Sequence, residues 1–341
     1  MSGPSLSLPH DDTASRPAPL LRLENLSVTF RTDAGPLHAV RNVSLSLPDG
    51  GITCLVGESG CGKSLTARAV LRLLPDNAAL SGRVLLRGVN LPDLPEKAMR
   101  SVRGRQIGMI FQEPMTSLNP VLTIGEQVAE PLRLHLKLSR SQARREVAAL
   151  LADVGIPSPA QRYGDYPHQL SGGMRQRVMI AMALACGPDI LLADEPTTAL
   201  DATIQGQILR LLENLRQERG MAVLLITHDL HVAAQTADTV GVMYAGRLVE
   251  YGPARELFAR PRHPYTRGLL QAAPGFAARN LSRLPAIAGS VPPLDKMPGG
   301  CPFHPRCAKA FDQCAQAMPP ANVVGPHSVA CWREVAATDG A

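Results

Sequence analysis

The chain has 341 residues, a length that predicts about two domains. Hydrophobic residues make up 45% of it and charged residues 19%, a composition that excludes a disordered or fibrous protein and supports a large core. Because only 4% of the residues are aromatic, aliphatic side chains must fill that core. The net charge of +6 is weaker than the clustered basic excess of many nucleic-acid binders, so we interpret it as an ordinary solvated surface.

Neither a membrane span nor a signal peptide is expected. The most apolar long stretch, 178–193, is interrupted by Gly187-Pro188-Asp189 and falls short of the roughly 20 residues that a span needs. Residues 1–19 contain acidic residues, serines and prolines but no apolar run, so we expect a disordered tail. We therefore expect a cytosolic chain that reaches a membrane only through partners, and a mild positive charge suits the anionic cytoplasmic leaflet.

Strands and helices are expected to alternate between residues 21 and 226. The expected strands are 21–56, with turns at 33–36 and 48–51, then 83–87, 106–111, 190–193 and 222–226. The expected helical segments are 63–74, 124–154 with its basic stretch 140–145 in solvent, 171–186 and 205–220. This alternation predicts a parallel α/β sheet with helices on its faces. No internal repeat is visible, which predicts one such unit.

The composition changes after about residue 260. Proline becomes frequent, strand patterns fade, and four of the seven cysteines fall in the last 41 residues. We place a domain boundary there, between 20–260 and 261–341. A region this small and rich in proline usually needs a metal, a disulfide or a partner to hold it together.

A phosphate-binding loop is predicted directly after the strand that ends at Val56. The pattern G-x-x-x-x-G-K-[ST] is matched by Gly57, Glu58, Ser59, Gly60, Cys61, Gly62, Lys63 and Ser64. Glycines let backbone N–H groups and a helix N-terminus face phosphate oxygens. Lys63 would neutralise the β- and γ-phosphates of a nucleotide, and Ser64 would bind Mg²⁺. The alternative is a chance glycine-rich turn, which the flanking strand and helix argue against.

Two adjacent acids, Asp194 and Glu195, end the apolar strand 190–193. In a phosphate-loop fold an acid in this place holds Mg²⁺. Neighbouring side chains at a strand end point to opposite faces, so the second acid can serve another purpose. We expect Asp194 to bind the metal and Glu195 to orient or deprotonate the attacking water. Without the phosphate loop, a solvated strand end would be the simpler interpretation.

The segment Leu170-Ser-Gly-Gly-Met-Arg-Gln-Arg177 resembles the LSGGQ signature of ABC ATPases, with Met174 in place of the usual glutamine. Ser171 can cap the following helix, and Gly172 and Gly173 leave backbone N–H groups open to an anion. The resemblance implies that this anion is the γ-phosphate of ATP bound by a second ATPase subunit. It also implies the ABC form of the P-loop α/β fold, with a RecA-like parallel core, an antiparallel β subdomain and a helical subdomain at about 113–185.

The other motifs of the ABC family occur in the same order along the chain. Gln112 matches the Q-loop glutamine, which by resemblance contacts Mg²⁺ and the membrane subunit. Ala199-Leu200-Asp201 matches the D-loop at the dimer interface, and His228 matches the switch histidine near the γ-phosphate. Phe30 matches the aromatic residue that stacks on adenine, although a strand phenylalanine is more often part of the core.

Two segments are similar to the ATPases of peptide and nickel importers, namely 112–120 and 263–267. The long C-terminal extension resembles that of dipeptide and oligopeptide importers in particular. The resemblance implies a heterodimer with a second ATPase, two transmembrane permeases and a solute-binding protein, at the cytoplasmic face of the inner membrane. An importer of nickel or another small solute, and a soluble ABC ATPase outside transport, remain the alternatives.

The four C-terminal cysteines, Cys301, Cys307, Cys314 and Cys331, are separated by five, six and sixteen residues. Structural zinc sites usually contain cysteine pairs two to four residues apart, which is not the pattern here. Four thiolates also suit an iron–sulfur cluster, and resemblance to some peptide-importer ATPases implies a [4Fe-4S] centre. Zinc, or no metal at all, stays possible. The remaining cysteines, Cys54, Cys61 and Cys186, are expected to be buried thiols.

Overall fold

The computed structural model describes residues 19–113, 117–198, 200–276, 285–324 and 327–335. The expected tail therefore lies almost wholly outside the described residues, as do Ala199 and three residues of the segment 112–120. No helix in the described part of the chain is long and apolar enough to cross a bilayer.

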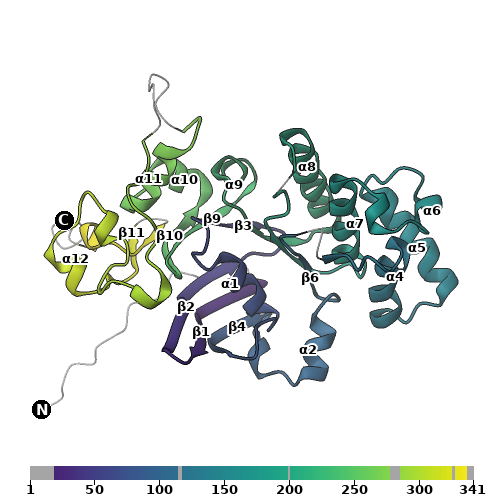
Figure 1. Cartoon of the computed structure of the whole chain (residues 1–341), viewed down its shortest axis with the longest axis horizontal. Helices are drawn as coiled ribbons and strands as arrows, with labels where there is room; N and C mark the ends of the chain where they lie inside the picture. Colours follow the sequence, from purple (N-terminus) through teal and green to yellow (C-terminus); the bar gives the residue numbers. More distant parts are fainter. Residues whose placement is uncertain (1–18, 114–116, 199, 277–284, 325–326, 336–341) are drawn as a thin grey trace, which may run out of the picture.

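A mixed sheet lies at the centre of the molecule (Figure 1). In the described chain its strand order is β11-β12-β10-β9-β3-β8-β7-β6, and β3 runs parallel to both neighbours. Residues of β3, β7 and β8 are all buried, as continuous apolar runs require when both faces are covered. The strands are β3 (Ile52–Val56), β6 (Ile107–Ile110), β7 (Ile190–Asp194), β8 (Ala222–Ile226), β9 (Thr239–Tyr244), β10 (Arg247–Pro253), β11 (Asn322–Val324) and β12 (His327–Val329).

A second, antiparallel sheet packs beside this core with the strand order β2-β1-β4-β5. One face of β1 is buried and the other is partly exposed, which is why its sequence alternates. Its strands are β1 (Leu21–Thr32), β2 (Gly35–Leu47), β4 (Ala78–Leu86) and β5 (Val89–Asn90).

The helices lie around the two sheets, and α4 to α7 form an arm at one end of the molecule (Figure 1). They are α1 (Lys63–Val70), α2 (Glu96–Val102), α4 (Ile124–His135), α5 (Arg140–Asp153), α6 (Pro159–Arg162), α7 (Gly172–Leu184), α8 (Ala202–Arg219), α9 (Leu230–Thr236), α10 (Ala254–Ala259), α11 (Pro264–Ala272), α12 (Asp312–Gln316) and α13 (Trp332–Val335). Short 3₁₀ turns span Leu91–Asp93, Pro167–Gln169, Leu294–Lys296 and His304–Arg306.

Several element boundaries differ from the sequence expectation. The helix expected to reach Leu74 ends at Val70, because Arg72 adopts a positive φ of 54° that a right-handed helix cannot contain. The helical stretch 124–154 is two helices, and the second starts with a capping box between Ser139 and Gln142. The strand expected at 83–87 begins five residues earlier, at Ala78, where pairing with β1 extends it.

The C-terminal region is less separate from the core than its sequence indicated. Strand patterns were expected to fade after residue 260, yet β12 pairs with β10 through Glu250 and Val329. Cys301 and Phe303 belong to the same buried cluster as the central sheet. The region therefore shares apolar core with the rest of the chain, which relieves its shortage of core residues.

Candidate functional site

The loop 57–64 joins β3 to α1 and wraps tightly on itself. Gly57 is required there, because a Cβ atom would lie 2.2 Å from the Met243 carbonyl oxygen. Gly62 caps α1 with a φ of 100°, a conformation that favours glycine. The buried Lys63 donates from Nζ to the carbonyl oxygens of Gly57, at 2.8 Å, and Glu58, at 3.1 Å. The loop thus holds its cation beside the N-terminus of α1, where anions are favoured. Ser59, Gly60 and Cys61 complete it, with Cys61 fully buried.

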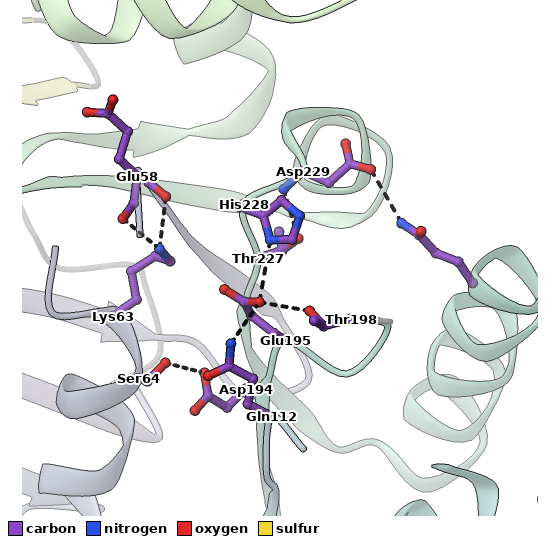
Figure 2. A network of polar contacts seen from close by, with 12 residues as sticks. Glu58, Lys63, Ser64, Gln112, Asp194, Glu195, Thr198, Thr227, His228 and Asp229 are labelled. Atoms are coloured by element: carbon purple, nitrogen blue, oxygen red, sulfur yellow. Dashed lines mark hydrogen bonds and ion pairs between the residues drawn. The ribbon is translucent and has the colours of Figure 1, made fainter. Parts of the chain in front are cut away.

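Asp194, the last residue of β7, is fully buried beside Ser64 (Figure 2). The Ser64 hydroxyl donates to Asp194 Oδ1 at 2.7 Å, whereas Oδ2 is buried with no hydrogen-bond partner in the described chain. Burial raises the pKa of Asp194, and the Ser64 hydrogen bond opposes part of that rise. An unpartnered carboxylate oxygen next to a hydroxyl fits a hard cation such as Mg²⁺.

Glu195 is the centre of a polar network that the sequence expectation captured only in part (Figure 2). Three groups converge on its Oε2 atom: the Gln112 amide at 3.2 Å, the Thr198 hydroxyl at 2.7 Å and His228 Nδ1 at 3.4 Å. Glu195 has a positive φ of 46°, so the chain turns sharply after Asp194 and aims the two carboxylates differently. Oε2 is thereby held while Oε1 has none of these three contacts, an arrangement able to orient a water molecule.

The signature segment lies elsewhere, on the helical arm. Ser171 caps α7 by accepting a hydrogen bond from the Met174 N–H at 3.3 Å. A Cβ atom on Gly173 would lie 3.0 Å from Ile204 of α8, and one on Gly172 would lie 4.0 Å from Leu200. The signature glycines thus face the D-loop region of the same chain. Asp201 caps α8 through a 2.9 Å hydrogen bond from the Ile204 N–H.

The structure therefore brings together one part of the predicted site and leaves another apart. Gln112, Asp194, Glu195 and His228 lie with Lys63 and Ser64 in one network (Figure 2). Helix α7 belongs to the arm formed by α4 to α7, whereas α1 lies near the centre of the molecule (Figure 1). Phe30 is half-buried on β1, where it pairs with Leu37 of β2 and Ala78 of β4.

The four C-terminal cysteines line one small cavity, together with Phe303, Trp332 and other residues. The Cys301 N–H donates to the Cys314 carbonyl oxygen at 2.8 Å. Burial raises the pKa of Cys301 to about 11, and the other three thiols add to the rise. In the described chain, however, no group of three His, Cys, Asp or Glu residues is arranged to hold a metal ion. The geometry alone thus adds no direct support to the predicted metal centre.

The other cysteines are free and buried, as expected. Burial raises the pKa values of Cys54, Cys61 and Cys186, although Lys63 opposes the rise for the first two.

Sequence reasoning missed three residues that contact this site. Thr198 was not singled out, although a hydroxyl three residues after Glu195 is a local signal that could have found it. Tyr265 accepts a 3.0 Å hydrogen bond from the Glu58 N–H, and Arg306 forms an ion pair with the Glu58 carboxylate at 2.7 Å. Both are more than 200 residues from Glu58, so no local pattern predicts these contacts.

Comparisons with known proteins identify the family of this chain. A family model described as "ABC transporter" matches residues 40–198, and one described as "Oligopeptide/dipeptide transporter, C-terminal region" matches residues 249–314. A putative peptide import ATP-binding protein of Brucella ovis is 50% identical over 334 residues, covering 94% of this chain and 99% of the relative. The dipeptide transport ATP-binding protein DppD of Bacillus subtilis is 49% identical over 316 residues, covering 92% of this chain and 94% of DppD.

Solved structures show the same fold. The ABC transporter cassette MJ0796, solved as a dimer, is 31% identical with a TM-score of 0.62, covering 69% of this chain and 99% of that one. The same cassette in a post-hydrolysis state bound to ADP and Pi gives the same values. Fold and site thus define an ABC-type ATP hydrolase. More specifically, the chain belongs to the peptide-import ATP-binding family of ABC transporters.

Proposed function

We propose that this chain hydrolyses ATP to energise the import of dipeptides or oligopeptides. The observation that carries the proposal is the union, in one chain, of an ATP-binding cassette with the C-terminal region of oligopeptide and dipeptide transporters. Relatives named for peptide import match almost end to end. Neither a nickel importer nor a soluble ABC ATPase is favoured by any relative reported above.

We propose the following division of labour at the ATP site. The loop 57–64 cradles the phosphates with its N–H groups, Lys63 neutralises them, and Phe30 stacks on adenine. Ser64, Asp194 and the amide oxygen of Gln112 would hold Mg²⁺, which would offset the charge that develops on the transferred phosphoryl group. The unpartnered Asp194 Oδ2 supports this assignment.

We further propose that Glu195 orients and deprotonates the attacking water. Its Oε2 atom is held by Gln112, Thr198 and His228, which leaves Oε1 to accept a hydrogen bond from that water. His228 would sense the γ-phosphate, and its 65% exposed side chain lies 3.4 Å from Glu195 Oε2. Positioning a water in this way is a form of general-base catalysis.

A second ATPase subunit is required by this proposal. Ser171, Gly172 and Gly173 lie on the arm, apart from the Lys63 network of their own chain (Figure 1). We propose that they complete the ATP site of a partner cassette and that Asp201 lies at the interface. The dimeric form of the MJ0796 cassette supports this arrangement. We expect a heterodimer with another ATPase.

The membrane partners would be two permeases and, through them, a solute-binding protein, with this chain at the cytoplasmic face. Exposed apolar side chains next to the Q-loop support a permease contact there, because Phe111, Val121 and Leu122 all reach solvent. We place the ATP-binding domain at 20–260, its helical subdomain at about 113–185, and the C-terminal region at 261–341.

We also propose that Cys301, Cys307, Cys314 and Cys331 bind one structural [4Fe-4S] centre, with zinc as the alternative. The proposal rests on the number and chemistry of these four thiols, which line one cavity. A single zinc ion would require sulfur atoms about 3.8 Å apart, from zinc–sulfur bonds of about 2.3 Å. In the described chain, no group of three His, Cys, Asp or Glu residues is arranged to hold either metal. Anaerobic purification should yield about four iron and four sulfide per chain, and stoichiometric zinc or no metal would refute the cluster.

The transport proposal is tested by uptake. Cells that lack this chain should lose accumulation of a labelled dipeptide and regain it with the wild-type chain. A chain with Glu195→Gln should not restore uptake. Normal dipeptide uptake in the deletion strain, with nickel uptake lost instead, would refute the peptide assignment.

A further inference from the structure

One arginine of the C-terminal region, Arg306, contacts the phosphate loop. The Arg306 side chain is only 5% exposed and pairs with both carboxylate oxygens of Glu58, at 2.7 and 3.0 Å. It also donates to the Tyr244 hydroxyl at 3.4 Å, with its guanidinium carbon 5.7 Å from the centre of the Tyr244 ring. A bidentate arginine–carboxylate pair fixes the orientation of the carboxylate as well as its distance, which a lysine cannot do.

Glu58 is held at each of its polar groups. Its N–H donates to the Tyr265 hydroxyl at 3.0 Å, and its carbonyl oxygen accepts from Lys63 Nζ at 3.1 Å (Figure 2). Arg306 holds the side chain. Two of these three partners, Tyr265 and Arg306, come from the C-terminal region, so that region fixes the first turn of the phosphate loop.

The contact is braced by a buried aromatic group. Tyr244 and Tyr265 are fully buried, and the Phe303 ring lies 5.2 Å and 5.3 Å from their ring centres. Phe303 begins the short turn that carries Arg306, whose N–H donates to the Phe303 carbonyl oxygen at 3.0 Å. A displacement of this turn would therefore move the Arg306 guanidinium relative to Glu58.

The same turn is bounded by two of the four clustered thiols. Cys301 and Cys307 flank Arg306 in sequence, and both line the thiol cavity. The Cys307 N–H donates to the His304 carbonyl oxygen, inside the turn, at 3.2 Å. Whatever orders the four thiols thus also sets the position of Arg306.

We infer that Arg306 is a positioning residue for nucleotide binding, which pre-organises the phosphate loop through Glu58 and couples that loop to the four-cysteine unit. The second half of this inference rests on the proposal that the cysteines hold a metal centre. A loop that is already ordered loses less conformational entropy when the nucleotide binds. We therefore expect Arg306 to act on nucleotide affinity. Coupling between two sites is reciprocal, so ATP would in turn affect the four-cysteine unit and any metal that it holds.

The first test compares Arg306→Ala with the full-length parent chain. It should raise the Kd of a fluorescent ATP analogue, and the KM for Mg-ATP, about three- to tenfold while kcat changes less than about twofold. Arg306→Lys should recover part of the loss. Arg333→Ala is the matched control, because Arg333 belongs to the same C-terminal region but contacts Lys309 and Phe311 there. An Arg306→Ala chain that binds nucleotide as Arg333→Ala does would overturn the inference.

Glu58→Ala removes the other end of the pair without changing the C-terminal region. It should weaken ATP binding as Arg306→Ala does, and the double variant should be no weaker than either single variant. Additive losses would show that the two residues act separately and would contradict the inference. This arm also remains informative if Arg306→Ala folds poorly.

Coupling to the thiols is tested with Cys307→Ser, with metal content measured on every chain. Cys307→Ser should weaken ATP binding when Arg306 is present and have no further effect in Arg306→Ala. ATP should change the visible absorption of the parent's metal centre but not that of Arg306→Ala. If the parent contains metal but Cys307→Ser weakens ATP binding equally with and without Arg306, the coupling is refuted and the metal proposal stands. A metal-free parent refutes the metal proposal and the coupling, while the affinity loss in Arg306→Ala still tests the positioning role.

Discussion

At the scale of single residues, the ATP site is built from two adjacent acids with unlike surroundings. Asp194 is fully buried beside Ser64, and one oxygen of Glu195 is contacted by Gln112, Thr198 and His228. The change in backbone direction at Glu195, with its positive φ, separates the two carboxylates. One can thus serve a cation while the other serves a water.

Replacing Glu195 with glutamine should leave ATP binding nearly intact and lower the hydrolysis rate roughly 10²- to 10⁴-fold, the usual range for a lost general base. The amide keeps the shape of the side chain but cannot take a proton. Single-turnover hydrolysis and nucleotide binding are measured on the same preparation. Turnover within a few-fold of the parent would exclude the assignment.

Replacing Asp194 with asparagine should stabilise the nucleotide-free protein at neutral pH. Burial raises the pKa of Asp194, so its protonated form is favoured in the fold, and this contribution is lost as pH rises through the raised pKa. In EDTA, the Tm of the variant should exceed that of the parent at pH 7.5, by less at pH 5.5. Mg-ATP should raise the Tm of the parent by more than that of the variant. A lower Tm for the variant at pH 7.5 would contradict this account.

The residues that we propose for the ATP site were predicted from sequence because each belongs to a local pattern. Lys63 and Ser64 follow a strand and open a helix, and Asp194 ends an apolar run. The role of Arg306 could not be predicted, because it depends on a contact with Glu58, which is 248 residues away in sequence. The arrangement of the four cysteines could not be predicted either, because spacing in sequence does not give the distances between sulfur atoms.

At the scale of elements, the strands and helices around the site pack closely against one another. Gly108 of β6 lies directly under α7, where a Cβ atom would be 2.3 Å from the Ala183 carbonyl oxygen. Long apolar runs predicted β3, β7 and β8 closely, because strands buried on both faces read as continuous hydrophobic segments. The pairing of β12 with β10 was missed, because three-residue strands have no period to detect.

Gly108→Ala should therefore destabilise the fold by about 1–3 kcal/mol or more, the cost of overpacking against backbone that cannot yield. Gly164→Ala is the matched control, since its Cβ atom would meet nothing within 4 Å and its change should stay within about 0.5 kcal/mol. Urea unfolding of both variants measures the difference. Equal stability of the two would show that β6 and α7 are not packed as described.

At the scale of the whole molecule, we propose that the ATP site of one chain is incomplete. The phosphate loop and the acids occupy the centre, while the signature residues sit on the arm (Figure 1). Hydrolysis per chain should thus rise with protein concentration and approach zero at high dilution. A purified monomer with full activity, independent of concentration, would refute the two-subunit site.

The most direct test of the account is peptide-stimulated ATP hydrolysis in the assembled transporter. The chain is reconstituted in nanodiscs with its second ATPase and its permeases, and the solute-binding protein is added with and without a peptide. The account predicts that peptide-loaded binding protein stimulates hydrolysis, that Glu195→Gln in this chain sharply reduces it, and that nickel has no effect. A hydrolysis rate that does not change with peptide, or that nickel increases instead, would contradict the account.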